Sequence, residues 1–382
     1  MRVALDDQCQ DVQHRHTRLR SVLLGSANRG RPCDTDCHLW DIPRRPLRSL
    51  SVYTPYGSPF TTDGISSSLP DYKIAPEHGS TNPWRADASA GGKFEVTIRS
   101  DVSSGQANVL PLPSGTTAQH PGYLVYRVYL PAVGDFSHVK LPTLTMEKGS
   151  ASTELSSCSV HTSPVLAPEK APATTSTAVT SAGATPPAGE FYKPAQKTDA
   201  GLLANADVAY AEAYVVRPSA ADVVVVTGKA PTHAPGDDPS PWPAPGDDMR
   251  YWSMCIGVGV ANTPTVVNDL TAGKTDYGCR ADQATKLDAA GNYTFVIGTE
   301  AQRAAINRVP DVTFLPFSTS QAASVYLLLL RNLLVSSQFT NSVQNVTTTL
   351  SPSAASVAMG SYYPTVSTCP SAALAAKGVR GC

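Results

Sequence analysis

The chain of 382 residues contains one series of strand-like motifs twice. The matched positions are Arg48 with Arg250, Phe94 with Tyr293, Pro111 with Pro316, and Arg127 with Arg331. The offsets between these matched positions are 202, 199, 205 and 204 residues. Solenoids and propellers have a much shorter period of roughly 20–50 residues. A nearly constant offset of domain length predicts two copies of one domain that arose by internal duplication.

The residues within these motifs are typical of β-strands. Aromatic and β-branched side chains alternate with polar ones in short segments, and turn residues separate the segments, with 32 Pro and 27 Gly in the chain. Many short strands with regular turn signals favour sandwiches or jelly rolls. We therefore predict an all-β fold of two tandem jelly-roll or sandwich-like domains with few short helices.

Composition divides the chain into five parts. The predicted parts are an atypical segment at 1–47, a first β domain at 48–149, a Ser/Thr/Ala/Pro-rich linker at 150–204, a second β domain at 205–350 and a C-terminal tail at 351–382. The linker has long stretches without aromatic residues and lacks the apolar area that would offset the entropy of ordering it.

The segment 1–47 lacks what its position in the duplication requires. The second copy has two strand-like segments before its Arg motif, Ala209–Val216 and Val223–Val226, but positions 5–30 hold a single short apolar piece. Either the first domain is naturally truncated, or the start is wrong and a signal peptide is missing with it. Arg-rich sequence without Lys before Lys73 favours the wrong start. We predict that this segment is disordered or mis-started and that the first domain is incomplete.

The charge balance excludes some partners. The formal net charge is −1, charged residues make up 16% of the chain, and no basic stripe is interleaved with aromatic residues. This pattern argues against nucleic-acid binding. No apolar run reaches the length of about 18 residues that a membrane-spanning helix needs, so we predict no membrane span.

The spacing of the eight cysteines fits a secreted protein with one or two disulfides. Cys255 and Cys279 flank a loop and form the best candidate pair. Cys369 and Cys382 are the second candidate pair, which would close the C-terminal tail. The sequence alone leaves the connectivity open.

Motifs for cofactor, metal or catalytic chemistry are missing from the sequence. Cys33 and Cys37 followed by His38 have the look of a metal site, but no second Cys/His pair lies at a suitable distance, so we predict no metal and no cofactor. No Gly-x-Ser-x-Gly elbow, His-Glu-x-x-His helix or phosphate-binding glycine loop occurs. Whether the protein is an enzyme stays open.

The repeated motifs resemble a pair of bacterial domains of unknown function, numbered twelve-fifty-four and twelve-fourteen. The similar residues are Arg250-Tyr251-Trp252-Ser253, Phe314-Leu315-Pro316 followed by Leu330-Arg331, and Asn108-Val109-Leu110-Pro111 with Tyr126–Pro131. The resemblance implies two jelly-roll-like domains in tandem. It implies no catalytic residue, because the family has no agreed activity.

Three residues are candidates for ligand contact. Arg127 and Arg331 lie within apolar strands, where an Arg must reach water or a carboxylate; a structural ion pair is the favoured reading and an anion-binding cleft the alternative. Trp242 lies in a Gly/Pro/Asp-rich loop, where a core role is less obvious than for Trp252.

These observations favour an exported protein of the extracellular space or cell envelope. We expect a binding or envelope-associated structural module whose ligand is a glycan or a lipid. The alternative is a hydrolase that acts on envelope glycan or lipid in a cleft between the domains. It would require convergent carboxylates or a Ser-His pair in one pocket. The oligomeric state is not predicted.

Overall fold

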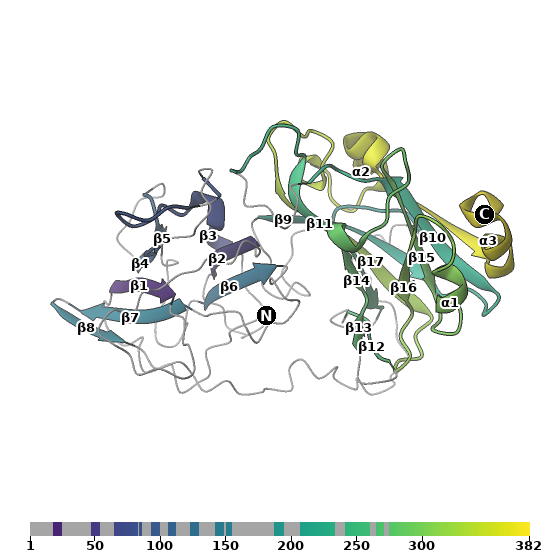
Figure 1. Ribbon diagram of the computed structural model, residues 1–382, viewed down its shortest axis with the longest axis horizontal. Helices are drawn as coiled ribbons and strands as arrows, with labels where there is room; N and C mark the ends of the chain where they lie inside the picture. Colours follow the sequence, from purple (N-terminus) through teal and green to yellow (C-terminus); the bar gives the residue numbers. More distant parts are fainter. Residues whose placement is uncertain are drawn as a thin grey trace. The chain divides into compact units, whose positions relative to one another are not determined.

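The computed structural model describes residues 18–24, 47–53, 65–82, 84–85, 93–99, 106–111, 123–129, 142–148, 150–154, 187–194, 207–233, 241–259, 265–270 and 275–382. The chain forms two compact units (Figure 1). The first comprises Met1–Ser163, Lys197–Asp207 and Pro235–Ala244, and the second comprises Pro164–Gln196, Val208–Ala234 and Pro245–Cys382.

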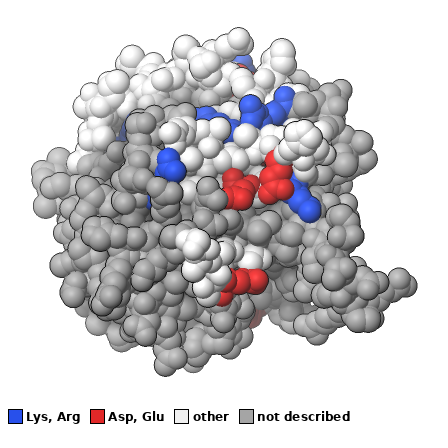
Figure 2. Space-filling model, turned by 90° about the vertical axis from the view of Figure 1, so that its left-hand side faces the viewer, with Lys and Arg blue, Asp and Glu red and all other residues white. Residues whose placement is uncertain are grey.

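The first unit contains two sheets among its described residues. A five-stranded sheet has the order β5-β4-β1-β7-β8, and a three-stranded sheet has the order β3-β2-β6. The strands are β1 (Arg18–Leu24), β2 (Leu47–Tyr53), β3 (Ile65–Pro70), β4 (Thr97–Arg99), β5 (Val109–Pro111), β6 (Tyr123–Tyr129), β7 (Pro142–Lys148) and β8 (Ala151–Glu154). Acidic and basic side chains are mixed among the described residues of the face in Figure 2, which agrees with the balanced composition.

The second unit has two four-stranded sheets, with the orders β16-β15-β10-β18 and β14-β11-β17-β9, and a small two-stranded sheet β12-β13. Its strands are β9 (Val208–Val216), β10 (Asp222–Lys229), β11 (Met249–Val258), β12 (Val267–Asp269), β13 (Thr275–Tyr277), β14 (Cys279–Ala281), β15 (Asn292–Gly298), β16 (Val312–Pro316), β17 (Val325–Val335) and β18 (Thr365–Pro370). Its helices are α1 (Arg303–Ile306), α2 (Pro352–Met359) and α3 (Ser371–Lys377), with short 3-10 turns including η9 (Gly378–Gly381).

The core of the second unit lies between its two four-stranded sheets. In β9 the buried residues alternate with partly exposed ones, as expected of a strand with one face in a core. The main cluster of buried side chains takes members from both sheets, among them Val224, Phe295, Ile297, Trp252, Met254 and Leu328. Two packed sheets with side chains interdigitating between them form a β-sandwich.

A second apolar cluster covers the outer face of the sheet that contains β10. Val223 and Val225 of β10 pack there with Ile306 of α1 and Leu374 of α3.

The predicted all-β class with few short helices is confirmed by the described strands, sheets and helices.

The two units share a strand-pairing pattern. In the first unit the parallel pair β5–β4 lies beside β1, and β1 lies beside β7, both in antiparallel pairings. In the second unit the parallel pair β16–β15 lies beside β10, and β10 lies beside β18, again in antiparallel pairings. The pair β2–β6 likewise matches β11–β17, with Ser49 opposite Arg127 and Ser253 opposite Arg331. The two serines are 204 residues apart, as are the two arginines, an offset close to those seen in the sequence motifs. The register makes Ser49 and Ser253 equivalent, rather than Arg48 and Arg250.

The structure differs from expectation within residues 1–47, because β1 occupies Arg18–Leu24. Leu19 pairs with Ile98 of β4, as Val224 of β10 pairs with Ile297 of β15. The strand therefore occupies the same place in its sheet as β10 does in the sheet of the second unit. Its polar first half carries no alternating pattern, so pairing with β4 and β7 determines its conformation rather than local propensity.

The C-terminal part of the chain also differs from expectation. Residues 351–382 were expected to form a tail, yet β18 pairs with β10 along six positions and so completes the sheet. Leu374 of α3 is buried in the apolar cluster on that sheet. These residues belong to the second unit because they cover apolar side chains that would otherwise face water.

Part of the predicted linker is packed rather than free. Phe191 is fully buried in the core of the second unit, and Tyr192 forms a β-bridge with Glu212 of β9. Two backbone hydrogen bonds of 2.9 and 2.8 Å between Tyr192 and Glu212 extend the edge of that sheet. The strand β8 also lies within the range expected to be linker. Residues 155–186 and 195–204 lie outside the described part of the chain.

Candidate functional site

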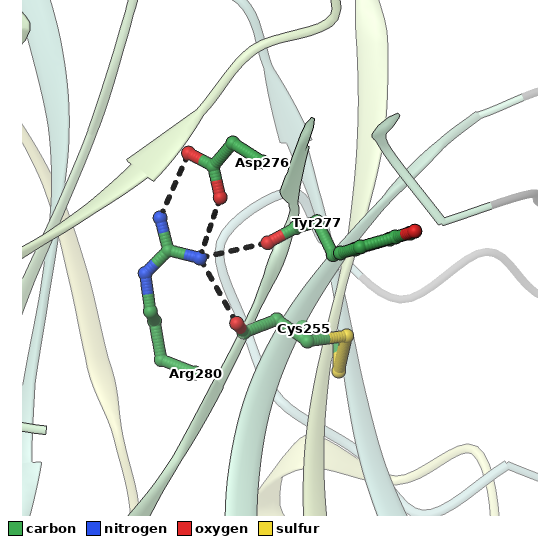
Figure 3. The surroundings of a disulfide bond; sticks show 5 residues. Cys255, Asp276, Tyr277 and Arg280 are labelled. Carbon is green, nitrogen blue, oxygen red and sulfur yellow. Dashed lines mark hydrogen bonds and ion pairs between the residues drawn. A yellow bond between two sulfur atoms is a disulfide. The ribbon is translucent and has the colours of Figure 1, made fainter. Parts of the chain in front are cut away.

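Both predicted disulfides are present. Cys255 is bonded to Cys279 and Cys369 is bonded to Cys382. The first bond joins directly opposite residues of β11 and β14 (Figure 3). The second ties β18 to the end of the chain after η9. Disulfides persist in oxidising compartments, so the pair of bonds favours a location outside the cytoplasm.

The three residues predicted to contact a ligand lie in separate places. Arg331 of β17 is partly buried, and its guanidinium carbon lies 5.3 Å from the centre of the Tyr210 ring. Arg127 of β6, in the first unit, pairs with Ser49 of β2. The side chain of Arg127 lies outside the described part of the chain. Trp242 is only 8% exposed, and its backbone N–H donates to the carbonyl of Trp84 over 2.9 Å. The Trp242 ring is thus buried like a core side chain.

A charged cluster adjoins the Cys255–Cys279 disulfide. Asp276 of β13 accepts two hydrogen bonds from Arg280 of β14, from Nη1 to Oδ1 at 2.9 Å and from Nη2 to Oδ2 at 3.0 Å. The Arg280 Nη1 group also donates to the Tyr277 carbonyl at 2.7 Å and to the Cys279 carbonyl at 3.0 Å. Paired bonds of this kind fix the plane of a guanidinium. Arg280 therefore holds β13 and β14 in one arrangement (Figure 3).

The glycine between these two strands is required by close packing. A Cβ atom on Gly278 would lie 2.8 Å from Cγ2 of Ile256. The Gly278 N–H donates to the Val266 carbonyl, and its carbonyl accepts from the Ile256 N–H, both at 2.7 Å. The hairpin thus lies against β11 at a distance that a larger residue would prevent.

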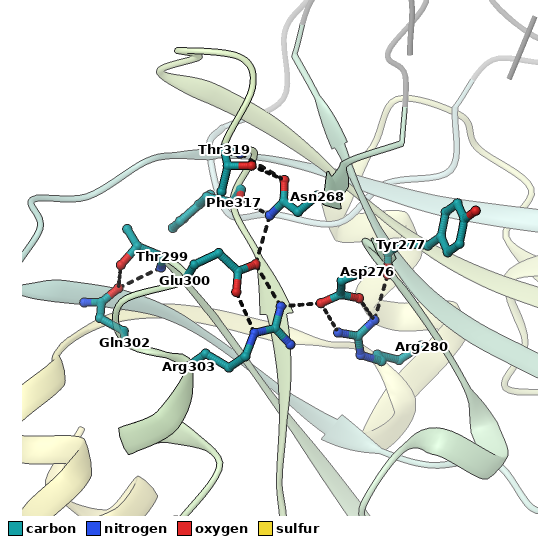
Figure 4. Close-up of polar contacts among 10 residues, drawn as sticks. All are labelled: Asn268, Asp276, Tyr277, Arg280, Thr299, Glu300, Gln302, Arg303, Phe317 and Thr319. Carbon is teal, nitrogen blue, oxygen red and sulfur yellow. Dashed lines mark hydrogen bonds and ion pairs between the residues drawn. The ribbon is translucent and has the colours of Figure 1, made fainter. Parts of the chain in front are cut away.

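The cluster continues onto segments that follow β15. Arg303 of α1 donates from Nη2 to Asp276, from Nε to Glu300 at 2.6 Å and from Nη2 to Glu300 at 2.8 Å. Its guanidinium carbon lies 4.3 Å from the centre of the Phe314 ring. Arg303 thus connects two carboxylates that come from different parts of the chain (Figure 4).

Asn268 of β12 completes the cluster. Its Nδ2 group donates to Glu300 at 3.0 Å and to the Phe317 carbonyl at 2.9 Å, and its Oδ1 accepts from the N–H and the hydroxyl of Thr319. The Asn268 side chain is fully buried. The hairpin β12–β13 is therefore fastened to the loops after β15 and β16 (Figure 4).

These contacts settle the ionisation of both carboxyl groups. Burial opposes the charge of Asp276, but hydrogen bonds from Arg280 and Arg303 outweigh burial, so the pKa of Asp276 is below its usual value. The hydrogen bond from Arg303 lowers the pKa of Glu300, and its bonds to Glu300 and Asp276 raise the pKa of Arg303. Both carboxylates therefore stay ionised near neutral pH, and neither is a proton donor.

One aromatic side chain projects from this cluster into solvent. Tyr277 is 62% exposed, whereas most aromatic residues of the second unit are buried. Its backbone is held by Arg280 on one side and by the β12–β13 pairing on the other. We call Asn268, Asp276, Tyr277, Arg280, Glu300 and Arg303 the hairpin site. An exposed ring on a rigid, hydrogen-bonded base is suited to binding, because little conformational freedom remains to be lost.

Another carboxyl group in the second unit, that of Glu212, has a raised pKa, whereas those of Asp276 and Glu300 are lowered. Burial raises the pKa of Glu212 in β9 to about 7. The neighbouring Tyr192 and Tyr214 share a side-chain hydrogen bond, and burial raises the pKa of both. Glu212 can therefore exchange a proton near neutral pH, unlike the carboxylates of the hairpin site.

The single His of the second unit lies beside an acid. His233 Nδ1 is 3.7 Å from Oδ2 of Asp282, which is buried and accepts from the N–H groups of Trp252 and Gln283. Burial raises the pKa of Asp282, while His233 and these two donors act against that rise.

The described residues contain neither a metal-binding cluster nor a membrane-spanning helix. Within the described ranges, no group of three or more His, Cys, Asp and Glu side chains is arranged to hold a metal ion. Among those same residues no helix has the length and apolar character to span a membrane. The motif Cys33, Cys37 and His38 lies outside these ranges.

Sequence reasoning missed the hairpin site. Its residues come from β12, β13, β14, the turn after β15 and the start of α1, so no single motif reveals it. Two local signals were present, the spacing of four between Asp276 and Arg280 and the spacing of three between Glu300 and Arg303. The contact between Arg303 and Asp276 could be recognised only from the fold.

Comparisons with known proteins assign no family. No protein-family model matches the chain, and no curated protein matches its sequence. Among solved structures, it is similar to a crystal structure of a putative uncharacterized protein from Burkholderia cenocepacia, with a TM-score of 0.44 and 11% sequence identity. That match covers 87% of this chain and 75% of the other.

Proposed function

We propose that this protein is an exported, two-domain binding or envelope-associated structural module, and that the hairpin site contacts a glycan. The two disulfides support export, because they favour an oxidising compartment. The resemblance to the domains of unknown function twelve-fifty-four and twelve-fourteen is part of this proposal and rests on the motifs given above.

The observation that carries the proposal is the exposed ring of Tyr277 beside a fixed array of polar groups. An aromatic face covers the apolar C–H surface of a sugar, and the phenol hydroxyl bonds to its edge. Tyr and Arg dominate many binding surfaces because they supply contact area and directional donors together. At the hairpin site the Asp276–Arg280 pair fixes the guanidinium group, and Arg280 also donates to the backbone carbonyl of Tyr277.

The electrostatics of the site favour binding over hydrolysis. Glycoside hydrolysis needs one protonated carboxyl group that donates its proton to the oxygen of the leaving group. Asp276 and Glu300 both have lowered pKa values, so they serve as acceptors and not as acids.

The test is a titration of the full chain with neutral and anionic glycan fragments, monitored by calorimetry. Tyr277→Ala is expected to weaken glycan binding roughly tenfold or more, the loss typical of an aromatic anchor. Tyr277→Phe, which keeps the ring, should lose less. Val357→Ala is the matched control, because Val357 is 84% exposed and lies on α2 outside the site. Equal binding by Tyr277→Ala and the parent chain would contradict the proposal.

The alternative function is a hydrolase acting on envelope glycan or lipid. It is favoured by one observation, the pKa of about 7 at Glu212, which is suited to a general acid. A Glu212→Gln chain should then lose all turnover of a glycan or lipid ester while keeping its fold. Turnover that survives this change would exclude Glu212 as the acid.

A further inference from the structure

A second, chemically different site lies on the outer face of the sheet that contains β10. A pocket of about 1000 Å³ opens there, within the size range of known ligand sites. It is lined by β10, β15 and β18, by the loop between α1 and β16, and by α3 and η9. In Figure 1, β10 and β15 run side by side, with α3 close to them.

The floor of the pocket is a row of hydroxyl groups. Thr227 of β10 is directly opposite Thr294 of β15 on one side and Thr365 of β18 on the other. Directly paired residues point to the same face of a sheet, so the three threonines form one row. The hydroxyls of Thr227 and Thr365 are 2.8 Å apart.

The row marks a change in the character of this face. Val223 and Val225 point to the same side of β10 as Thr227, because side chains alternate along a strand. Both valines are buried beneath α1 and α3. At Thr227 the face becomes polar, and this residue lines the pocket instead of packing beneath the helices. The polar part of this sheet face that lines the pocket is suited to contact with water or a polar ligand.

Positive side chains surround this floor. The charged residues in the lining are Lys229, Arg308, Lys377 and Arg380, with Asp288 and Asp311. All four cationic residues are exposed. Within the described part of the chain, none of these four forms an ion pair with a carboxylate, whereas Arg280 and Arg303 do.

One of the two acids is already engaged. Asp288 accepts hydrogen bonds from the N–H groups of Ala290 and Asn292 and from Nδ2 of Asn292. These bonds close the turn before β15 and occupy both carboxylate oxygens. The rim therefore has an excess of positive charge in a chain whose net charge is −1. Like charges gathered around one cavity repel each other unless an anion is bound between them.

We propose that this pocket binds an anionic oligosaccharide, a sugar chain that carries sulfate, phosphate or carboxylate groups. The four cationic side chains recognise the anionic groups, and the threonine row together with Asn292 and Ser361 hydrogen-bonds to sugar hydroxyls. The Cys369–Cys382 disulfide joins β18 to the end of η9 and so fixes the segment that carries Arg380. This site is separate from the hairpin site and does not depend on the function proposed there.

The experiment is a calorimetric titration of the full chain with three tetrasaccharides, one sulfated, one composed of uronic acids and one neutral. Both anionic probes are expected to bind, the neutral one at least roughly tenfold more weakly, and rising salt should weaken the anionic binding. An inositol hexakisphosphate arm separates a sugar chain from a phosphorylated headgroup. Preference for that compound over both anionic sugars would overturn the sugar assignment.

A double variant places the binding in the pocket. Arg308→Ala with Arg380→Ala should reduce the affinity for the anionic probes roughly tenfold or more, because two charge-assisted contacts are removed. Lys286→Ala removes an exposed cation outside the lining and should leave the affinity unchanged. An unchanged melting temperature confirms that the variants fold. No anionic binding, equal binding of the neutral probe, or equal losses in the double variant and Lys286→Ala would each overturn the proposal.

Discussion

Individual ionisable residues in the second unit fall into two groups with opposite behaviour. Asp276 and Glu300 are held ionised by arginines, while burial favours the protonated form of Glu212. The first group stabilises a surface, and the second responds to pH near neutrality. The two predictions at this scale follow from that division.

The Asp276→Ala substitution is expected to lower the free energy of unfolding by about 2 to 4 kcal/mol. The substitution removes the carboxylate that Arg280 and Arg303 share, while both guanidinium groups stay partly buried. Leaving a partly buried charge without its acceptor costs more free energy than the intact ion pairs contribute to stability. Because the folded pKa of Asp276 is depressed, its contribution is present above pH 3.8 and is lost as the pH falls below that value. Urea denaturation at pH 7 measures the loss.

Asp269→Ala is the control for this substitution. Asp269 is an exposed carboxylate on the same hairpin and has a single long hydrogen bond of 3.4 Å, from Thr275. It should change stability by less than about 0.5 kcal/mol, as exposed sites usually do. Similar losses for the two variants would show that the Asp276 cluster contributes no special stability.

The raised pKa of Glu212 predicts that stability depends on pH with a sign opposite to that expected for Asp276. Its pKa rises from 4.5 to about 7 on folding, so the unfolded chain releases this proton first. Stability is therefore highest below pH 4.5, falls as the pH rises toward about 7, and levels off above. Glu212→Gln should flatten the stability profile in this window, and Glu190→Gln, at an exposed position, should not. A Glu212→Gln profile with the parent slope would refute the assignment.

At the scale of elements, the C-terminal part depends on one covalent bond and one strand pairing. β18 is an edge strand next to β10, and the Cys369–Cys382 bond closes the segment that follows it. A closed loop of this length stabilises a fold by about 3 kcal/mol, because it restricts the unfolded chain.

Replacing Cys369 and Cys382 by Ser should therefore lower the free energy of unfolding by about 3 kcal/mol. Hydrogen exchange should accelerate first in β18 and α3, and β11 should keep its protection. The matched variant, Cys255→Ser with Cys279→Ser, should instead expose amides of β13 and β14. Uniform acceleration in both variants would mean that neither disulfide acts locally.

The strands that sequence predicts best are those with the largest buried faces. β11 and β17 are buried along most of their length, and their apolar runs are visible in the sequence. β1 and β18 were missed because Arg18 to Ser21 and Thr365 to Pro370 have little apolar pattern. Both strands exist through pairing with a neighbour, which single-sequence patterns do not record.

The candidate sites were less predictable than the fold. Cys255 and Cys279 were identified because spacing constrains a disulfide. Tyr277 was missed because an exposed aromatic residue has no distinctive pattern, and Trp242, which stood out in its loop, is buried. Which side chains meet depends on strand register, as in the contact between Arg303 and Asp276.

At the scale of the whole molecule, the two units share strand pairing, but the described hairpin site and cationic pocket both belong to the second. The shared pairing involves the strands β4, β5, β1 and β7 of the first unit and β15, β16, β10 and β18 of the second. The sites are formed by the β12–β13 hairpin, α1 and the C-terminal segment with α3, which lie outside the strand pairs that the two units share. This division agrees with folds that keep a scaffold and vary its loops to obtain function.

We propose that the chain binds glycan without cleaving it. The most direct measurement incubates the full chain with envelope glycan fragments, quantifies bound ligand by calorimetry, and then analyses the recovered fragments by mass spectrometry. We predict saturable binding that depends on Tyr277 and recovery of fragments with unchanged mass. Fragments shortened by hydrolysis, with turnover lost in Glu212→Gln, would contradict the claim and establish the enzyme instead.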